Sequence, residues 1–163
     1  MLTAHAARVS AGGAWQHRTP LPQALRGGRF FAPLAVELPA LRSLEREVFG
    51  PIVHVVRYRA GDLDEVVDSI NAMGYGLTLG IHTRIDTVAD RIAARARIGN
   101  IYINRNMIGA VVGVQPFGGC GLSGTGPKAG GPHYLARFAT EQTVSTNTAA
   151  VGGNASLLSL AEE

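Results

Sequence analysis

The sequence predicts an α/β fold that contains an at least partly parallel sheet, and two observations support this. Between residues 52 and 104, runs of β-branched and other apolar residues alternate with amphipathic helical patterns. The resulting order of strand, helix, strand, helix and strand is typical of an α/β layer, because crossovers through helices favour parallel pairing. Only about half of a typical doubly wound sheet can be counted, so we expect the 163 residues to form part of a larger domain.

The first third of the chain predicts two strands. Residues 1–29 indicate the end of a helix followed by a connector that contains Gly, Pro and Arg. Phe30 to Glu37 is apolar but interrupted by Pro33, which indicates a short or edge strand. Leu41 to Val48 predicts one or two turns, and the β-branched run from Ile52 to Tyr58 predicts a strand.

Two helices and two further strands follow in the middle of the chain. Asp62 is a suitable N-cap for a helix whose apolar residues recur at i, i+3, i+4 and i+7, namely Leu63, Val66, Val67 and Ile70. Leu77 to His82 predicts a strand. Asp86 predicts the cap of a second helix with Gly99 at its C′ position, and Asn100 to Asn104 predicts the next strand.

Glycine is concentrated in one segment, since Gly109 to Gly131 contains 9 glycines in 23 residues. This composition excludes a helix or a central strand, and a loop of this length inside a compact chain is usually functional. After it, His133 to Thr140 predicts a short helix and Glu141 to Thr148 an extended strand that leaves the domain body. The apolar tail from Gly152 to Glu163 predicts contact with a partner.

Charge and cysteine content exclude several functional classes. The chain has 15 Lys and Arg against 12 Asp and Glu, and the basic residues are scattered, so we expect no nucleic-acid partner. One cysteine excludes an intramolecular disulfide, and no Cys/His cluster has zinc-ligand spacing, so no metal site is predicted. No apolar run approaches the roughly 18–20 residues that cross a bilayer. With no signal-peptide pattern at the N-terminus, we expect a cytoplasmic location.

Two motifs inside the glycine-rich segment are better explained without a cofactor-binding or catalytic role. Gly119 to Gly124 fits the pattern G-x-G-x-x-G, but Pro116 precedes it and no helical pattern follows, as a dinucleotide site would require. Cys120 has no helix N-terminus to activate a thiolate, and the nearest histidine in the sequence is His133. We therefore interpret Cys120 as a small loop residue rather than a nucleophile.

Four segments together resemble the C-terminal half of an aldehyde dehydrogenase. They are Glu47 to Pro51 (EVFGP), Asn71 to Leu77 (NAMGYGL), Gly99 to Asn104 (GNIYIN) and Gln115 to Gly126 (QPFGGCGLSGTG). Ile108 to Gly131 and Gly153 to Leu158 (GNASLL) resemble more narrowly the glutamate-γ-semialdehyde (pyrroline-5-carboxylate) dehydrogenase module of bifunctional proline utilisation A. Cys120 departs from that family, in which an acidic residue is expected.

The resemblance implies an architecture for the whole chain. Residues 1–138 would form the second half of a three-layer catalytic domain with a partly parallel sheet. Residues 139–163 would form an oligomerisation strand and a C-terminal tail, which implies a homodimer.

The resemblance also implies which residues bind ligands. Glu47 would accept hydrogen bonds from the nicotinamide ribose hydroxyls of NAD, and Phe49 would pack beside the nicotinamide. Gly109 and Ala110 match a loop whose backbone N–H groups hold the α-carboxylate of glutamate-γ-semialdehyde. Consecutive free N–H groups in a glycine-rich turn form an anion nest, so the residue types suit this role. Phe117 would pack on the aliphatic stem of the substrate.

No catalytic residue of that family falls within the chain, because its cysteine nucleophile, its general base and its Rossmann half lie upstream. We therefore expect this C-terminal fragment to be inactive alone. Two alternatives remain: an aldehyde dehydrogenase of other substrate specificity, and a non-catalytic truncated product that acts only as a dimerisation or interaction module.

Overall fold

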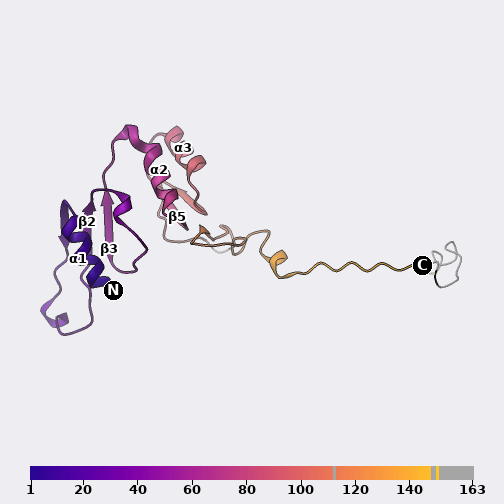
Figure 1. Cartoon of the computed structure of the whole chain (residues 1–163), viewed down its shortest axis with the longest axis horizontal. Coiled ribbons are helices and arrows are strands. Elements are labelled where there is room, and N and C mark those ends of the chain that lie inside the picture. Colours follow the sequence, from indigo (N-terminus) through magenta and orange to yellow (C-terminus); the bar gives the residue numbers. More distant parts are fainter. Residues whose placement is uncertain (112, 148–149, 151–163) are drawn as a thin grey trace. The chain divides into compact units, whose positions relative to one another are not determined.

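The computed structural model describes residues 1–111, 113–147 and 150, and the chain divides into two compact units (Figure 1). The first unit, Met1–Gly131, contains three α-helices and seven strands among its described residues. The second, Pro132–Glu163, contains one described 3₁₀ turn, Leu135–Phe138.

The first unit begins with a helix packed on a three-stranded sheet. Helix α1 (Leu2–Gly12) precedes strands β1 (Trp15–Arg18), β2 (Leu34–Leu38) and β3 (Ile52–Val56). The strand order is β1-β2-β3, with β1 antiparallel and β3 parallel to β2. The core of this part is a cluster formed by Val9, Val36 and Leu38.

Two predictions for this region are corrected. The expected connector contains β1, and the strand expected to be short or at an edge is β2, which is short (five residues) but central in its sheet. Pro33 permits this because it stands one residue before β2, where its missing N–H breaks no pairing. Its carbonyl accepts from the N–H of Thr19 (2.9 Å), and Leu34 donates to Pro51 (3.0 Å).

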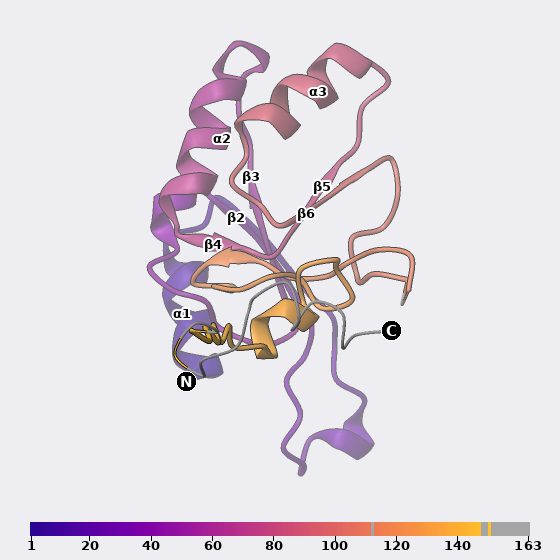
Figure 2. The same ribbon diagram turned by 90° about the vertical axis from the view of Figure 1, so that its right-hand side faces the viewer.

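The next part of the unit alternates helices and strands, as expected. Its elements are α2 (Leu63–Ala72), β4 (Tyr75–Gly76), β5 (Thr78–Ile81), α3 (Asp86–Arg95) and β6 (Asn100–Ile103). Strands β5 and β6 pair in parallel. Figures 1 and 2 show α2 and α3 side by side, and two ion pairs join them: Asp64–Arg91 (2.6 Å) and Asp68–Arg95 (2.5 Å).

The ends of the helices differ in detail from the prediction. Asp62 occupies the N-cap of α2, although its side chain makes no capping hydrogen bond. Ile85, not Asp86, is the N-cap of α3, and α3 ends at Arg95, so Gly99 is not at its C′ position. Asn71 of α2 caps this end from outside: its amide donates to the Arg95 carbonyl (3.0 Å) and accepts from the Arg97 N–H (2.7 Å).

The α/β class and the partly parallel pairing are confirmed, but the described strands form three small sheets rather than one. The third sheet pairs β4 with β7 (Cys120–Gly121), antiparallel, with Tyr75 opposite Gly121. The glycine-rich segment is therefore a loop with one very short strand in it, and this strand fastens the loop to the rest of the unit.

The second unit departs from the predicted elements. The helix expected over residues 133–140 is the single 3₁₀ turn Leu135–Phe138. Residues 141–147 form no strand, and the tail 152–163 lies outside the described residues. An oligomerisation strand at 139–163 therefore stays a prediction.

Candidate functional site

The first group of predicted site residues, Glu47 and Phe49, lies on the segment that leads into β3. Both side chains are exposed, and Phe49 is 86% exposed. The Glu47 carboxylate has no hydrogen-bond or ion-pair partner among the described residues, while its N–H lies 3.5 Å from the Tyr75 hydroxyl. Gly50, which follows Phe49, lies against the Leu2 side chain of α1, and a Cβ at this position would have to displace it. Both side chains are thus available to a ligand.

The second group begins with the backbone of Gly109 and Ala110, both half-buried. Their N–H groups have no acceptor among the described residues, and a Cβ added at Gly109 would meet nothing within 4 Å. The turn that follows is tied together, since the Val111 carbonyl accepts from Gln115 N–H (2.9 Å) and Gln115 Oε1 accepts from Val111 N–H (3.0 Å). Two successive donors therefore stand free beside a fastened turn.

Phe117, the remaining predicted residue, is half-buried on the same loop. Its backbone pairs with Ala129 through two hydrogen bonds, of 3.0 and 2.9 Å. The loop also lies directly against the start of β6, because a Cβ on Gly99 would stand 2.0 Å from the Gly118 carbonyl oxygen. Gly99 is therefore required because the loop and the strand approach each other closely here. The sequence instead predicts Gly99 as the residue that ends a helix.

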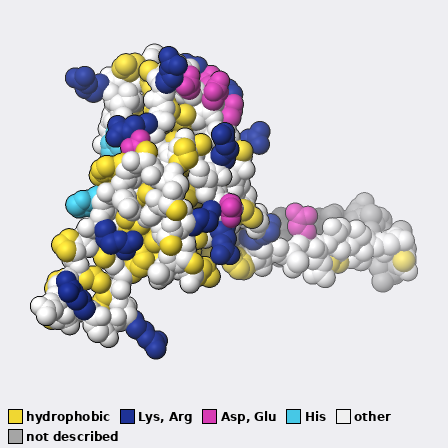
Figure 3. Space-filling view, turned by 60° about the vertical axis from the view of Figure 1, so that its left-hand side comes forward, with side chains coloured by type: hydrophobic (Ala, Val, Ile, Leu, Met, Phe, Trp, Pro, Cys, Tyr) yellow, Lys and Arg dark blue, Asp and Glu magenta, His cyan; other side chains and the backbone are white. Residues whose placement is uncertain are grey.

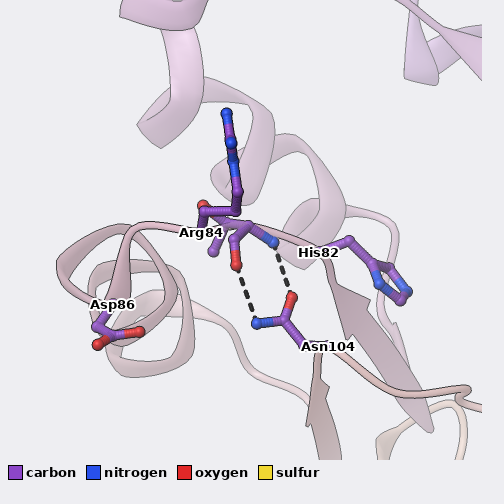
Figure 4. Close-up of a pocket in the computed structure, with 5 residues that line it drawn as sticks. His82, Arg84, Asp86 and Asn104 are labelled. Atoms are coloured by element: carbon purple, nitrogen blue, oxygen red, sulfur yellow. Dashed lines mark hydrogen bonds between the residues drawn. The ribbon is translucent and has the colours of Figure 1, made fainter.

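The carboxyl ends of β5 and β6 border an open hollow of about 540 Å³ that the sequence analysis did not predict (Figure 4). Asn104 has a φ of 53°, in the left-handed region. Its side-chain amide accepts from Thr83 N–H (3.0 Å) and donates to the Thr83 carbonyl (2.9 Å). Asparagine tolerates this backbone conformation better than most residues, and here it fixes the direction in which the chain leaves β6 towards Gly109.

Tyr75 is a second residue that sequence reasoning passed over. It pairs with Gly121 of the glycine-rich loop and its hydroxyl approaches the backbone of Glu47. It therefore contacts both the segment that carries Glu47 and the glycine-rich loop. Its place in the segment NAMGYGL was visible in the sequence, but its neighbours are 28 residues before and 46 residues after it and follow only from the fold.

Cys120 is half-buried, and its thiol faces carbonyl oxygens, those of Arg97 (2.7 Å) and Gly76 (3.8 Å). Such acceptors take a hydrogen bond from a thiol and offer none to a thiolate. Among the described residues no three His, Cys, Asp or Glu side chains gather as metal ligands would. Within the same residues, no helix has the length and apolar character needed to cross a membrane.

Comparison with known proteins identifies the family. The profile described as "Aldehyde dehydrogenase family" matches residues 2–144. The chain belongs to the aldehyde dehydrogenase family. Its most similar relatives include the bifunctional protein PutA of Rhizobium meliloti, 56% identical over 135 residues, which are 83% of this chain and 11% of that protein.

Solved structures agree with this family assignment. A crystal structure of proline utilization A (PutA) from Bradyrhizobium japonicum matches with a TM-score of 0.81 and 60% identity, covering 91% of this chain and 15% of that one. A 1-pyrroline-5-carboxylate dehydrogenase from Thermus with bound NAD matches with a TM-score of 0.69 and 33% identity, covering 83% and 26%. The chain thus corresponds to a portion of the dehydrogenase module of these aldehyde dehydrogenases and spans a small share of their length.

Proposed function

We propose that the chain is the C-terminal part of an NAD-dependent L-glutamate-γ-semialdehyde dehydrogenase, the enzyme that oxidises the open form of pyrroline-5-carboxylate to glutamate. The observation that carries the proposal is the 60% identity, at a TM-score of 0.81, to a PutA structure over 91% of the chain. In the complete enzyme this segment would bind cofactor and substrate, while the nucleophile and the general base come from residues upstream.

The residues on the cofactor side fit NAD. The Glu47 carboxylate is exposed and without a partner among the described residues, so it can accept two hydrogen bonds from a ribose diol. The exposed Phe49 ring, two residues later, offers an apolar face to the nicotinamide. NAD, when bound, would supply the hydride acceptor, with Glu47 holding its ribose and Phe49 packing beside its nicotinamide.

The residues on the substrate side fit a carboxylate attached to an aliphatic stem. The free N–H groups of Gly109 and Ala110 can donate to the two oxygens of an α-carboxylate. Phe117, held by its pairing with Ala129, can pack on the methylene carbons between that carboxylate and the aldehyde. A neutral aldehyde without the carboxylate would gain nothing from the first contact.

Oligomerisation of the complete enzyme through residues 139–163, and a cytoplasmic location, belong to the same proposal. In support of the first, Val144 exposes its apolar side chain within this segment, and Leu135 and Phe138 expose theirs just before it.

The test uses Gly109→Ala in the complete dehydrogenase that contains this segment. Because the added Cβ meets nothing within 4 Å, the fold tolerates it, and a bound carboxylate is the group that would feel it. We expect the KM for glutamate-γ-semialdehyde to rise about tenfold, while the KM for propanal changes less than about twofold.

Gly126→Ala is the matched control, since it lies on the same loop and its Cβ would also meet nothing within 4 Å. It should leave both KM values unchanged. An equal effect of Gly109→Ala on both aldehydes would contradict a carboxylate nest and favour an aldehyde dehydrogenase of other specificity.

A further inference from the structure

Asn100, the first residue of β6, is buried, with 7% of its surface exposed. Its side-chain amide lies across the backbone of the glycine-rich loop. Nδ2 donates to the Pro116 carbonyl (3.0 Å), and Oδ1 accepts from the Gly118 N–H (3.2 Å). One side chain therefore holds the two peptide groups on either side of Phe117.

The chemistry of this contact requires an amide. A neutral amide donates and accepts at the same time, whereas a carboxylate only accepts and would face the Pro116 carbonyl oxygen with a negative charge. An apolar side chain of the same size would leave a part-buried N–H and a part-buried carbonyl without their partner.

The backbone of Phe117 is also held from the opposite side. Its own N–H and carbonyl pair with Ala129, and the preceding residue, Lys128, donates through Nζ to the Gly99 carbonyl. Asn100 thus joins the start of β6 to the peptide groups on either side of Phe117. Lys128 joins the residue before β6 to the segment that pairs with Phe117. With its backbone held on two sides, the direction of the Phe117 ring follows from the position of β6.

We propose that Asn100 is a positioning residue that supports binding of the aldehyde substrate by holding Phe117 against the substrate's aliphatic stem. The inference rests on the proposed function, since it uses the contact assigned there to Phe117. Asn100 touches no substrate itself and acts through the loop backbone.

A matched control exists on α2. Asn71 makes the same pair of contacts, one donated to the Arg95 carbonyl and one accepted from the Arg97 N–H, but it holds the end of α3 rather than the residues beside Phe117. A substitution of either asparagine by aspartate removes one donor and adds one charge. A purely structural loss at either position would lower the yield of folded enzyme for every substrate alike, rather than raise the KM for the aldehyde alone.

The experiment compares Asn100→Asp, Asn71→Asp, Phe117→Ala and the double variant Asn100→Asp/Phe117→Ala in the complete dehydrogenase. We expect Asn100→Asp to raise the KM for glutamate-γ-semialdehyde about tenfold and also to raise the KM for propanal, whose carbons would contact the same ring, while kcat and the KM for NAD⁺ stay within about twofold of the parent. Asn71→Asp should leave all of these unchanged. In the double variant the effect of Asn100→Asp should vanish, because the two residues act as one unit.

Additive effects in the double variant, or equal effects of Asn100→Asp and Asn71→Asp, would overturn the inference. If Phe117→Ala raises the KM for glutamate-γ-semialdehyde and Asn100→Asp does not, the inference fails while the proposed function stands. If Phe117→Ala itself changes nothing, the contact assigned to Phe117 fails and the inference fails with it. Should Asn100→Asp not fold, Asn100→Ser, which keeps one polar group, carries the same expectations.

Discussion

Two glutamates, two positions apart, differ in what they contact. The Glu45 carboxylate lies 3.4 Å from the Arg8 guanidinium, whereas the Glu47 carboxylate has no partner among the described residues. Both are exposed, and only the second is assigned to the cofactor.

We therefore expect Glu47→Gln in the complete dehydrogenase to raise the KM for NAD⁺ about tenfold, since a neutral amide accepts more weakly from a diol than a carboxylate. Glu45→Gln should leave that KM unchanged. Steady-state kinetics with varied NAD⁺ at saturating aldehyde measures both, and equal KM values for the two variants would contradict the cofactor role of Glu47.

A histidine pair joins α1 to β3. His5 Nε2 lies 3.0 Å from His54 Nε2, and His5 is buried. Burial, together with the nearby Arg8 and Arg46 guanidinium groups, lowers the pKa of His5, and burial together with His5 lowers the pKa of His54. The unfolded chain therefore binds more protons than the folded chain below the ordinary histidine value of 6.5.

It follows that the free energy of unfolding decreases as the pH falls below about 6.5. Urea unfolding followed by circular dichroism at pH 8 and pH 5 should show this loss, and His54→Gln should reduce it because one of the two titrating rings is removed. His17→Gln, at an exposed position on β1, is the control and should retain the loss. A wild-type stability that does not change between the two pH values would contradict the buried neutral pair.

At the scale of elements, β2 carries the core of the three-stranded sheet. Val36 at its centre is fully buried, while Val53 on the adjacent β3 is 62% exposed. The two residues have the same side chain on neighbouring strands, so they separate the effect of burial from that of β-propensity.

We expect Val36→Ala to lower the free energy of unfolding by about 2 kcal/mol, through the lost burial and the cavity left behind. Val53→Ala should change it by less than about 0.5 kcal/mol. Urea denaturation at neutral pH measures both. Equal losses for the two variants would show that β2 does not form the core.

The elements with a strong local signal were predictable from the sequence, and those created by distant partners were not. Strand β3 and helices α2 and α3 follow from β-branched runs and helical periodicity. Strand β1, with the sequence WQHR, has no apolar alternation and exists because it pairs with β2. The end of α3 depends on Asn71 of another helix, which no local capping rule includes.

The candidate site divides in the same way. Its residue types follow from motifs, because a glycine-rich loop and an acid near an aromatic ring are visible in the sequence. The supports of these residues are long-range: Asn100 reaches across the loop, Asn104 holds Thr83, and Tyr75 approaches Glu47. Hydrogen bonds between residues so far apart in the chain arise only once the strands are paired.

At the scale of the whole molecule, many apolar side chains of the described residues are exposed. Ile108, Phe49 and Leu122 are each mostly exposed, and Figure 3 shows apolar side chains scattered among polar ones over one face. Large apolar side chains that stand out into solvent are often covered by another part of a protein. This exposure agrees with a segment that spans 11% of its PutA relative and whose counterparts there are parts of a much longer chain.

We propose that this chain supplies binding groups, but no nucleophile, to a glutamate-semialdehyde dehydrogenase. The most direct test of this claim is the rate of NADH formation from pyrroline-5-carboxylate and NAD⁺, measured for the purified 163-residue chain and for the complete dehydrogenase at equal molar concentration. We predict turnover by the complete enzyme and none by the chain alone above an enzyme-free control. Formation of NADH by the chain alone, lost on Cys120→Ala, would contradict the claim and make Cys120 the nucleophile.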